Sequence, residues 1–135
     1  MNDQQLLDDL FGEMVSSYSR AEAITDGVLV DASVGDLAEV SRQHFKYPIA
    51  MTAAVYELIK KAVDHPKHCN DWKGIWHDIC WMSKMNKTRI LDPTSHLFMV
   101  IINGTGRKRN HTLKIVCGPG DNAEPVLTVM MPEED

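Results

Sequence analysis

The sequence lacks most of the features that assign a function quickly. Its 135 residues contain no low-complexity tract and no internal repeat, and aromatic residues make up only 7% of them. No apolar run approaches the roughly 20 residues that a membrane-spanning helix needs, so we expect no membrane association. Residues 1–14, MNDQQLLDDLFGEM, have neither a basic region nor a continuous apolar stretch. We therefore expect no secretory signal.

Cysteine and positive charge are also scarce. The three cysteines, Cys69, Cys80 and Cys117, cannot all pair within one chain, and none forms a Cys-x-x-Cys motif. This pattern favours reduced thiols and a cytoplasmic location. The net charge of -5 argues against broad, non-specific binding to nucleic acid or to anionic membranes.

The remaining composition is that of one globular domain over residues 1–135, with 44% hydrophobic and 24% charged residues. Residues 1–90 are predicted to be mainly helical, with one short strand near 28–30. The apolar pattern and the turn residues of 96–131 are typical of three strands and predict a three-stranded antiparallel sheet. We therefore predict an α+β fold whose N-terminal and central helices pack on a small C-terminal antiparallel β-meander.

Apolar spacing and capping residues locate the helices. Residues 3–15 form an i, i+3, i+4, i+7 stripe with acidic residues on the other side, which predicts a short amphipathic helix. Ser19 and Glu22 make a capping box for a helix over 20–26, which Gly27 ends. Thr52 is a candidate cap for the next helix, which Pro66 closes. The stripe of that helix consists of Val55, Leu58, Ile59, Ala62 and Val63.

A tryptophan-rich helix is predicted from Asn70 or Asp71 to Asn86. At 100° per residue one arc forms its buried face, and this arc consists of Trp72, Ile75, Trp76, Ile79, Met82 and Ser83. His77, Trp81 and Lys84 fall on the opposite side. Trp81 must therefore be covered by another segment, such as the N-terminal helix, or by a partner. An exposed tryptophan is a typical interface anchor, so these three residues are the predicted partner-binding site.

The stretch HPKHCNDWKGIWHDIC, residues 65–80, raises the question of a metal site. His65, His68, Cys69, His77 and Cys80 would have to converge tetrahedrally. Cys80 is also explained as a small buried residue, and His68 and Cys69 are adjacent, which is an awkward ligand spacing. We predict a helix start, no metal and no cofactor.

Four further predictions come from the strands and turns. HLFMVIING, residues 96–104, is predicted to be a central strand covered on both faces. The following connection carries Arg107, Lys108 and Arg109 and could contact phosphates as a hairpin tip. Cys117 continues a strand alternation and is predicted to be in the core. A polar pocket that gathers Tyr18, Arg20, Asp26 and Asp121 would favour an enzyme.

A resemblance to a known family rests on four parts of the sequence. These are YSRAEAITDGVLVDAS, YPIAMTAAVYELI, the tryptophan-rich helix and GPGDNAEPVLTVMMPEED. The chain resembles an uncharacterised family of bacteria and phages whose members occur on prophages and plasmids. The similarity covers most of the chain, and the family has no assigned catalytic residues to transfer. What the resemblance implies is an origin on a mobile element.

These observations predict a small non-enzymatic interaction protein that acts in the cytoplasm on a host or rival protein, with counter-defence inhibition as its most concrete form. One alternative is a nucleic-acid-binding accessory protein that uses the tip at 105–111. Another is an enzyme built on the polar pocket. A homodimer is a further expectation, because sheet edges must be covered or paired.

Overall fold

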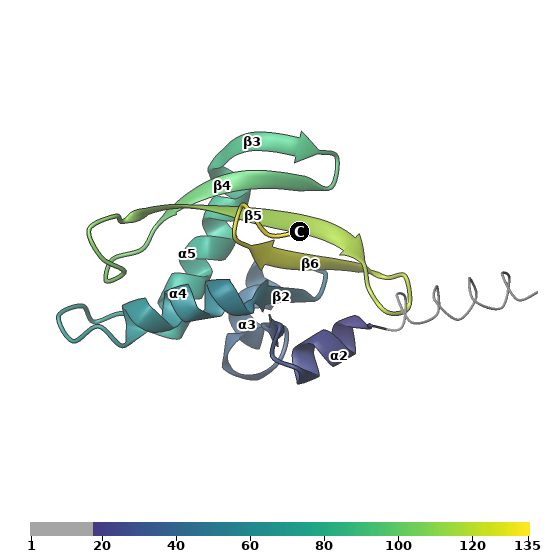
Figure 1. Cartoon of the computed structure of the whole chain (residues 1–135), viewed down its shortest axis with the longest axis horizontal. Coiled ribbons are helices and arrows are strands. Elements are labelled where there is room, and N and C mark those ends of the chain that lie inside the picture. The colour runs from purple at the N-terminus through teal and green to yellow at the C-terminus, as the bar shows by residue number, and fades with distance from the viewer. Residues whose placement is uncertain (1–17) are drawn as a thin grey trace, which may run out of the picture.

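The computed structural model describes residues 18–135, and the helix predicted for residues 3–15 lies outside this range. Short helices and strands alternate through the first half, and the last strands follow one another closely (Figure 1). In chain order the elements are α2 (Arg20–Thr25), β1 (Leu29–Asp31), the 3₁₀ turn η1 (Gly35–Leu37), α3 (Ala38–His44), β2 (Ile49–Thr52), α4 (Ala53–Val63), α5 (Trp72–Met85), β3 (Lys87–Asp92), β4 (Ser95–Ile101), β5 (Asn110–Pro119) and β6 (Pro125–Met130).

The strands form one six-stranded sheet in the order β1-β2-β6-β5-β4-β3. The antiparallel meander of β4, β5 and β6 is confirmed by its pairing. The sheet extends further on both sides, through β3 at one edge and through β2 and β1 at the other. Because β2 pairs with β6 in parallel, with Ile49 opposite Leu127, the sheet is mixed. The α+β class is thus confirmed, and the sheet is twice the predicted width.

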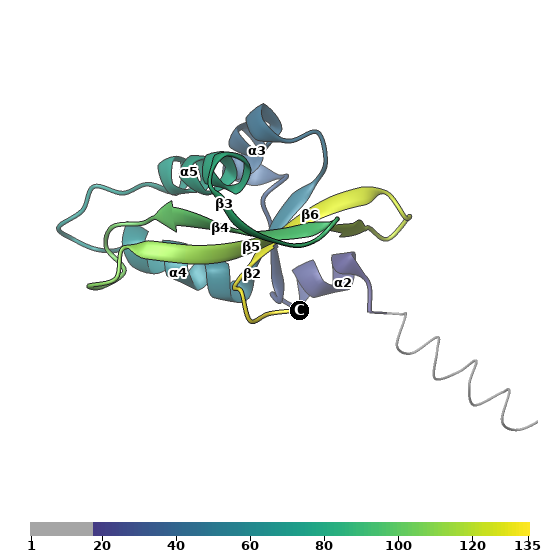
Figure 2. The same ribbon diagram turned by 90° about the horizontal axis from the view of Figure 1, so that it is seen from above.

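Helices cover both faces of this sheet. Figure 2 shows α3 and α5 on one face and α2 and α4 on the other. The helix over 72–85 buries the predicted arc and adds Cys80, while Trp72 and Met82 are only partly buried. The strand β4 lies next to the edge strand β3, and Ile101 on it is 60% exposed, so the prediction of a strand covered on both faces is wrong. No helix of the described range is long and apolar enough to cross a membrane.

Local signals explain where the helices begin. Ser19 Oγ accepts a hydrogen bond from the backbone N–H of Glu22 at 3.0 Å, and Gly27 ends α2 with a φ of 79°. Asp71 Oδ1 accepts from Gly74 N–H at 2.7 Å and caps α5. Asn70, the alternative cap, instead donates to the carbonyls of Ala62 and Asn103 and so ties the end of α4 to the β4–β5 connection.

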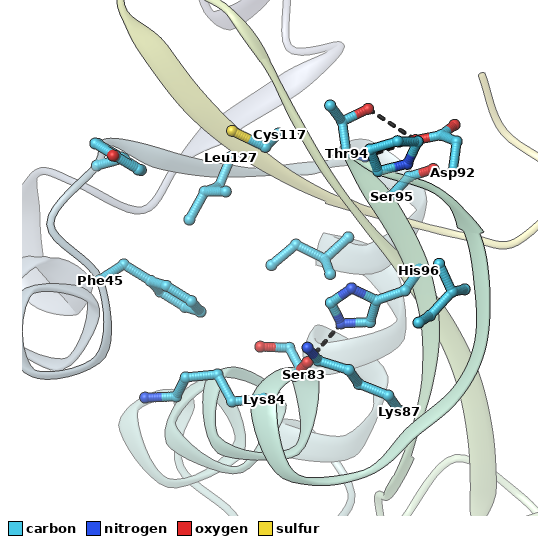
Figure 3. A pocket seen from close by; sticks show the side chains of 14 residues that line it. Phe45, Ser83, Lys84, Lys87, Asp92, Thr94, Ser95, His96, Cys117 and Leu127 are labelled. Carbon is cyan, nitrogen blue, oxygen red and sulfur yellow. Dashed lines mark hydrogen bonds between the residues drawn. The ribbon is translucent and has the colours of Figure 1, made fainter.

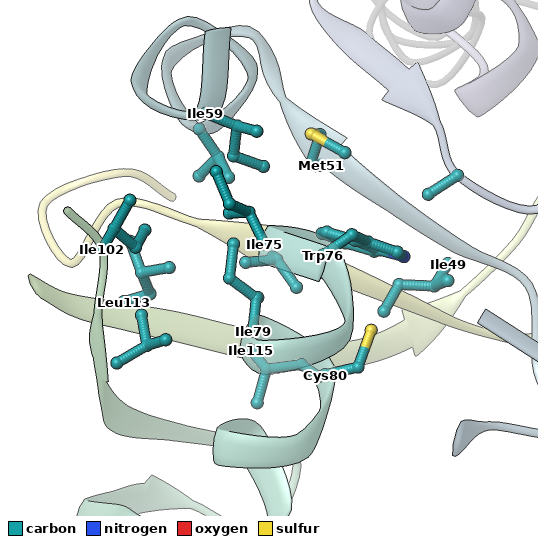
Figure 4. Close-up of a cluster of buried hydrophobic side chains, with 14 of the residues drawn as sticks. Ile49, Met51, Ile59, Ile75, Trp76, Ile79, Cys80, Ile102, Leu113 and Ile115 are labelled. Atoms are coloured by element: carbon teal, nitrogen blue, oxygen red, sulfur yellow. The ribbon is translucent and has the colours of Figure 1, made fainter. Parts of the chain in front are cut away.

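The core joins the helices of both faces to the sheet. Figure 4 shows Trp76 and Cys80 of α5 among buried isoleucines. One buried polar chain crosses this core: Trp76 Nε1–H donates to Ser41 Oγ at 2.9 Å, and Ser41 Oγ–H donates to the carbonyl of Ala32 at 2.6 Å. Because Trp76 belongs to α5 and Ser41 to α3, these hydrogen bonds hold the two helices together. Each buried polar group in them has a partner.

Candidate protein-interaction surface

Trp81 lies on the outer side of α5, where the helical periodicity places it away from the sheet. Its side chain remains 46% exposed. The end of α3 runs beside this part of α5, and it brings His44 and Phe45 next to the predicted residues His77 and Lys84. We call these five residues, His44, Phe45, His77, Trp81 and Lys84, the Trp81 patch. The predicted site residues therefore do converge, and α3 adds two more.

A chain of hydrogen bonds fixes the side chains of the patch. Lys84 Nζ lies 2.9 Å from His44 Nδ1, and His44 Nε2 lies 2.9 Å from His77 Nδ1. An ammonium group only donates, so His44 Nδ1 accepts and His44 Nε2–H donates to His77. Burial lowers the pKa of His44, and the positive charge of Lys84 and the nearby His77 lower it further. His44 is therefore held neutral in the tautomer that this chain requires.

Aromatic contacts hold Trp81 in the same patch. Its ring stacks against that of His77 with centroids 6.4 Å apart, and His44 meets it edge-on at 6.2 Å. Lys84 Nζ lies 5.3 Å from the Phe45 centroid and 5.8 Å from the Trp81 centroid, within reach of a cation–π interaction. Trp81 is thus exposed and at the same time positioned before any partner arrives.

An open groove of about 560 Å³ adjoins the patch and shares Phe45 and Lys84 with it (Figure 3). It lies between the ends of α3 and α5 and the strands behind them. Its other lining residues are Tyr47, Ser83, Lys87, Ile90, Asp92, Pro93, Thr94, Ser95, His96, Ile115, Cys117 and Leu127. Cys117 packs against the core, as predicted, yet it is only partly buried, because it also lines the groove.

The polar groups of the groove are mostly engaged. Asp92 Oδ1 accepts from the N–H and the hydroxyl of Thr94, each at 2.8 Å, and these hydrogen bonds keep the pKa of Asp92 below its ordinary value. His96 Nε2 lies 2.6 Å from the carbonyl oxygen of Ser83. Lys84 and Lys87 form a basic rim around the apolar interior of the groove.

The basic tip lies where the sequence indicates, in the connection between β4 and β5. Arg107, Lys108 and Arg109 are exposed there. Thr105 Oγ1 and His111 Nε2 lie 2.8 Å apart and hold the base of the tip together. Burial and the nearby Lys108 lower the pKa of His111, so the histidine adds little positive charge to the tip near neutral pH.

Two of the four residues of the proposed polar pocket, Arg20 and Asp121, pack α2 against the sheet. Asp121 accepts from the backbone N–H groups of Arg20 and Ala21 at 2.7 and 3.1 Å, and thus caps the helix from the β5–β6 turn. The Arg20 guanidinium donates to Thr128 Oγ1 and to the carbonyl of Leu127. The pKa of Tyr18 is raised by desolvation and by the Asp26 carboxylate at the other end of the helix. These contacts give Arg20 and Asp121 structural roles.

The histidines and cysteines of residues 65–80 lie in separate environments, apart from the pair His65 and His68. Cys80 is fully buried in the core, as predicted, and burial raises the pKa of its thiol to about 12. His77 belongs to the Trp81 patch, while His65 and His68 pack on each other with ring centroids 4.8 Å apart. Cys69 is exposed on the loop before α5.

Sequence similarity places the chain in a family. A model described as a family of unknown function, DUF6573, matches residues 9–135. The chain belongs to DUF6573. No curated protein and no solved structure shows significant similarity to it. Membership of DUF6573 thus covers α2 through β6, including both the Trp81 patch and the groove, and it carries no assigned activity.

Two parts of this surface were missed by the sequence analysis. His44 and Phe45 stand at the end of a short helix, where nothing in the local pattern relates them to α5. The groove depends on β3 and on the loop before β2, and neither strand was predicted. The apolar run Ile49–Met51 directly after Pro48 is the sequence signal that could have located β2.

Proposed function

We propose that the protein is a small, non-enzymatic interaction protein of a prophage or plasmid, which binds a host or rival protein in the cytoplasm. The observation that supports this is the Trp81 patch: a half-exposed tryptophan, fixed by its neighbours, beside an open apolar groove. Interface hot spots are enriched in tryptophan, and a side chain that is already ordered loses little entropy on binding. Counter-defence inhibition is the most concrete form of this activity.

The test is an affinity pull-down from host lysate with three tagged chains. Each is washed at low and high salt, with nuclease-treated and untreated samples in parallel. Wild type is compared with Trp81→Ala and with Ile101→Ala, an exposed apolar residue on β4 that serves as the matched control. We expect a discrete host protein to be retained by wild type and by Ile101→Ala. Trp81→Ala should weaken its binding by about thirtyfold or more, the size of a typical hot spot.

Circular dichroism of Trp81→Ala should match wild type, because the side chain lies outside the core. A host protein retained equally by Trp81→Ala would refute the assigned surface. Recovery of nucleic acid alone, lost at high salt, would refute the proposal as a whole.

The second candidate, a nucleic-acid-binding accessory protein, is supported by the exposed tip at Arg107, Lys108 and Arg109. Backbone contacts of this kind weaken steeply as salt rises. In that case Arg107→Ala and Arg109→Ala would reduce recovery of nucleic acid, whereas Trp81→Ala would leave it unchanged.

A further inference from the structure

The groove beside the Trp81 patch has an apolar floor and apolar side chains at its rim. Ile115, Cys117 and Leu127 of β5 and β6 form the floor, beside the last turn of α5 (Figure 3). At the rim, Ile90 is 73% exposed and Tyr47 is 46% exposed. Clustered apolar surface of this kind marks a binding site, because binding removes it from water. An occupant of the groove must therefore present apolar side chains to it.

The charges of the groove limit the occupant further. Lys84 and Lys87 are accompanied by one carboxylate, Asp92, which already accepts two hydrogen bonds within its own turn. In the part of the chain that the structure describes, the only ion pair joins Lys60 to Asp64, so no described carboxylate neutralises either groove lysine. The groove is thus locally basic in a chain whose net charge is -5. Acidic groups on an occupant are attracted here, and basic groups are repelled.

Both lysines can reach an occupant, although Lys84 also belongs to the Trp81 patch. The Lys84 ammonium group has three N–H donors, and it makes two contacts, at 2.9 Å to His44 Nδ1 and at 3.4 Å to the His44 carbonyl oxygen. One donor remains for a carboxylate. Lys87 is exposed on the edge strand β3. Figure 3 shows both lysines on the α5 side of the groove, so they can contact the same segment.

The groove continues the surface on which the proposed function rests. Phe45 and Lys84 belong both to the groove and to the Trp81 patch, so a protein bound over Trp81 reaches the groove without a gap. The groove volume of about 560 Å³ lies within the range of about 300–1,000 Å³ that is typical of ligand sites. It therefore has room for bulky apolar side chains of a bound segment.

We propose that the groove binds an acidic peptide segment of the partner protein, with a bulky apolar side chain against Ile90 and Tyr47 and with carboxylates against Lys84 and Lys87. This inference rests on the proposed function, because it names the chemistry of the segment that the partner brings next to the Trp81 patch. Burial of the apolar side chain supplies most of the affinity, and the two lysines select acidic segments over basic ones.

The experiment needs no knowledge of the partner. A random library of twelve-residue peptides displayed on phage is selected on the purified full-length protein and, in parallel, on Lys87→Glu. We expect wild type to enrich peptides that combine acidic residues with a bulky apolar residue, and Lys87→Glu to lose this enrichment. The most enriched peptide is then synthesised with a fluorescent label, and its Kd is measured by fluorescence anisotropy.

Two matched pairs of exposed residues test where this peptide binds. Lys87→Glu should weaken binding about tenfold, whereas Lys73→Glu, the same change of charge at the beginning of α5, should weaken it less than twofold. Ile90→Ala should weaken binding about fivefold through lost apolar contact, and Ile101→Ala on the neighbouring strand β4 should leave it unchanged. All four side chains are exposed, so the circular dichroism of each variant should match wild type.

Enrichment of uncharged or basic peptides, or of none, would overturn the proposal, and so would equal effects within either matched pair. Displacement of the peptide by oligothymidylate would overturn it in favour of nucleic acid as the occupant. A concentration-dependent dimer that Lys87→Glu and Ile90→Ala dissociate would overturn it in favour of a second copy.

The two proposals fail separately. An acidic peptide that Trp81→Ala weakens, but Lys87→Glu and Ile90→Ala do not, would reject the groove and leave the Trp81 patch as the binding surface. A pull-down that retains no host protein, together with acidic peptides bound as expected, would reject the proposed function and leave the preference of the groove in place.

Discussion

The buried hydrogen bonds from Trp76 through Ser41 to Ala32 allow a specific prediction about the free energy of unfolding. Ser41→Ala removes one hydroxyl and leaves two groups without partners: the indole N–H of Trp76 and the carbonyl oxygen of Ala32, on residues that are both 0% exposed. Each unpaired buried group costs about 1–3 kcal/mol. We expect Ser41→Ala to lower the free energy of unfolding by about 2–4 kcal/mol.

Ser83→Ala is the matched control, because it removes an equally buried hydroxyl. Ser83 Oγ–H donates at 2.7 Å to the carbonyl of Cys80, three residues earlier in the same helix. That carbonyl keeps its place in the helical hydrogen-bond ladder when the hydroxyl is lost, so the cost should stay below about 1 kcal/mol.

Urea unfolding followed by circular dichroism measures both variants. With a slope of about 2 kcal/mol per molar urea, the midpoint of Ser41→Ala should fall by about 1–2 M while the slope itself is unchanged. An equal or larger loss in Ser83→Ala would refute the reasoning, because it would show that removal of any buried hydroxyl has the same cost. A double-mutant cycle with Trp76→Phe would then isolate the pairwise coupling.

Two further predictions concern α2 and the Trp81 patch. Asp121→Ala removes the acceptor of the Arg20 and Ala21 N–H groups and should cost about 1 kcal/mol in urea unfolding, whereas Asn122→Ala next to it should cost less; equal losses would contradict the capping role. The pKa of His44 is lowered in the folded protein, so the unfolded chain binds more protons and stability falls as the pH drops below about 6.5. His44→Gln should reduce this loss of unfolding free energy between about pH 7.5 and 5.5 without abolishing it, because the pKa of His111 is also lowered, and an unchanged pH dependence would contradict the assignment.

Helices with strong local signals could be predicted from the sequence, and strands that depend on distant partners could not. The cap at Ser19, the stop at Gly27 and the buried arc of α5 follow from residues within one or two turns. By contrast, β3 (Lys87–Asp92) is exposed along its whole length, so no apolar alternation marks it, and only its pairing with β4 makes it a strand. β2 follows Pro48 and precedes a helix cap, and it becomes a strand because β6 and β1 lie on either side of it.

The residues of the candidate site also divide into those that local sequence predicts and those that depend on distant contacts. Trp81, His77 and Lys84 belong to one helix, and their common face follows from its period. His44 and Phe45 reach this face through the packing of α3 against α5, a tertiary contact that includes the hydrogen bond between Ser41 and Trp76. The polar-pocket hypothesis left open whether Asp121 and Arg20 meet; in the structure the Asp121 carboxylate accepts from the backbone N–H groups of Arg20 and Ala21.

The position of β6 has a consequence for the order in which the protein is made and folded. The last strand of the described residues takes a place in the middle of the sheet, between β2 from the first half of the chain and β5 from the second. Without β6, the β1–β2 pair and the β3–β4–β5 ladder are two separate pieces of sheet, and the edges that β6 joins, on β2 and β5, are unpaired. Long-range pairing of this kind closes slowly, because the entropy of a long loop must be lost first. The chain therefore completes its sheet only after β6 has been synthesised.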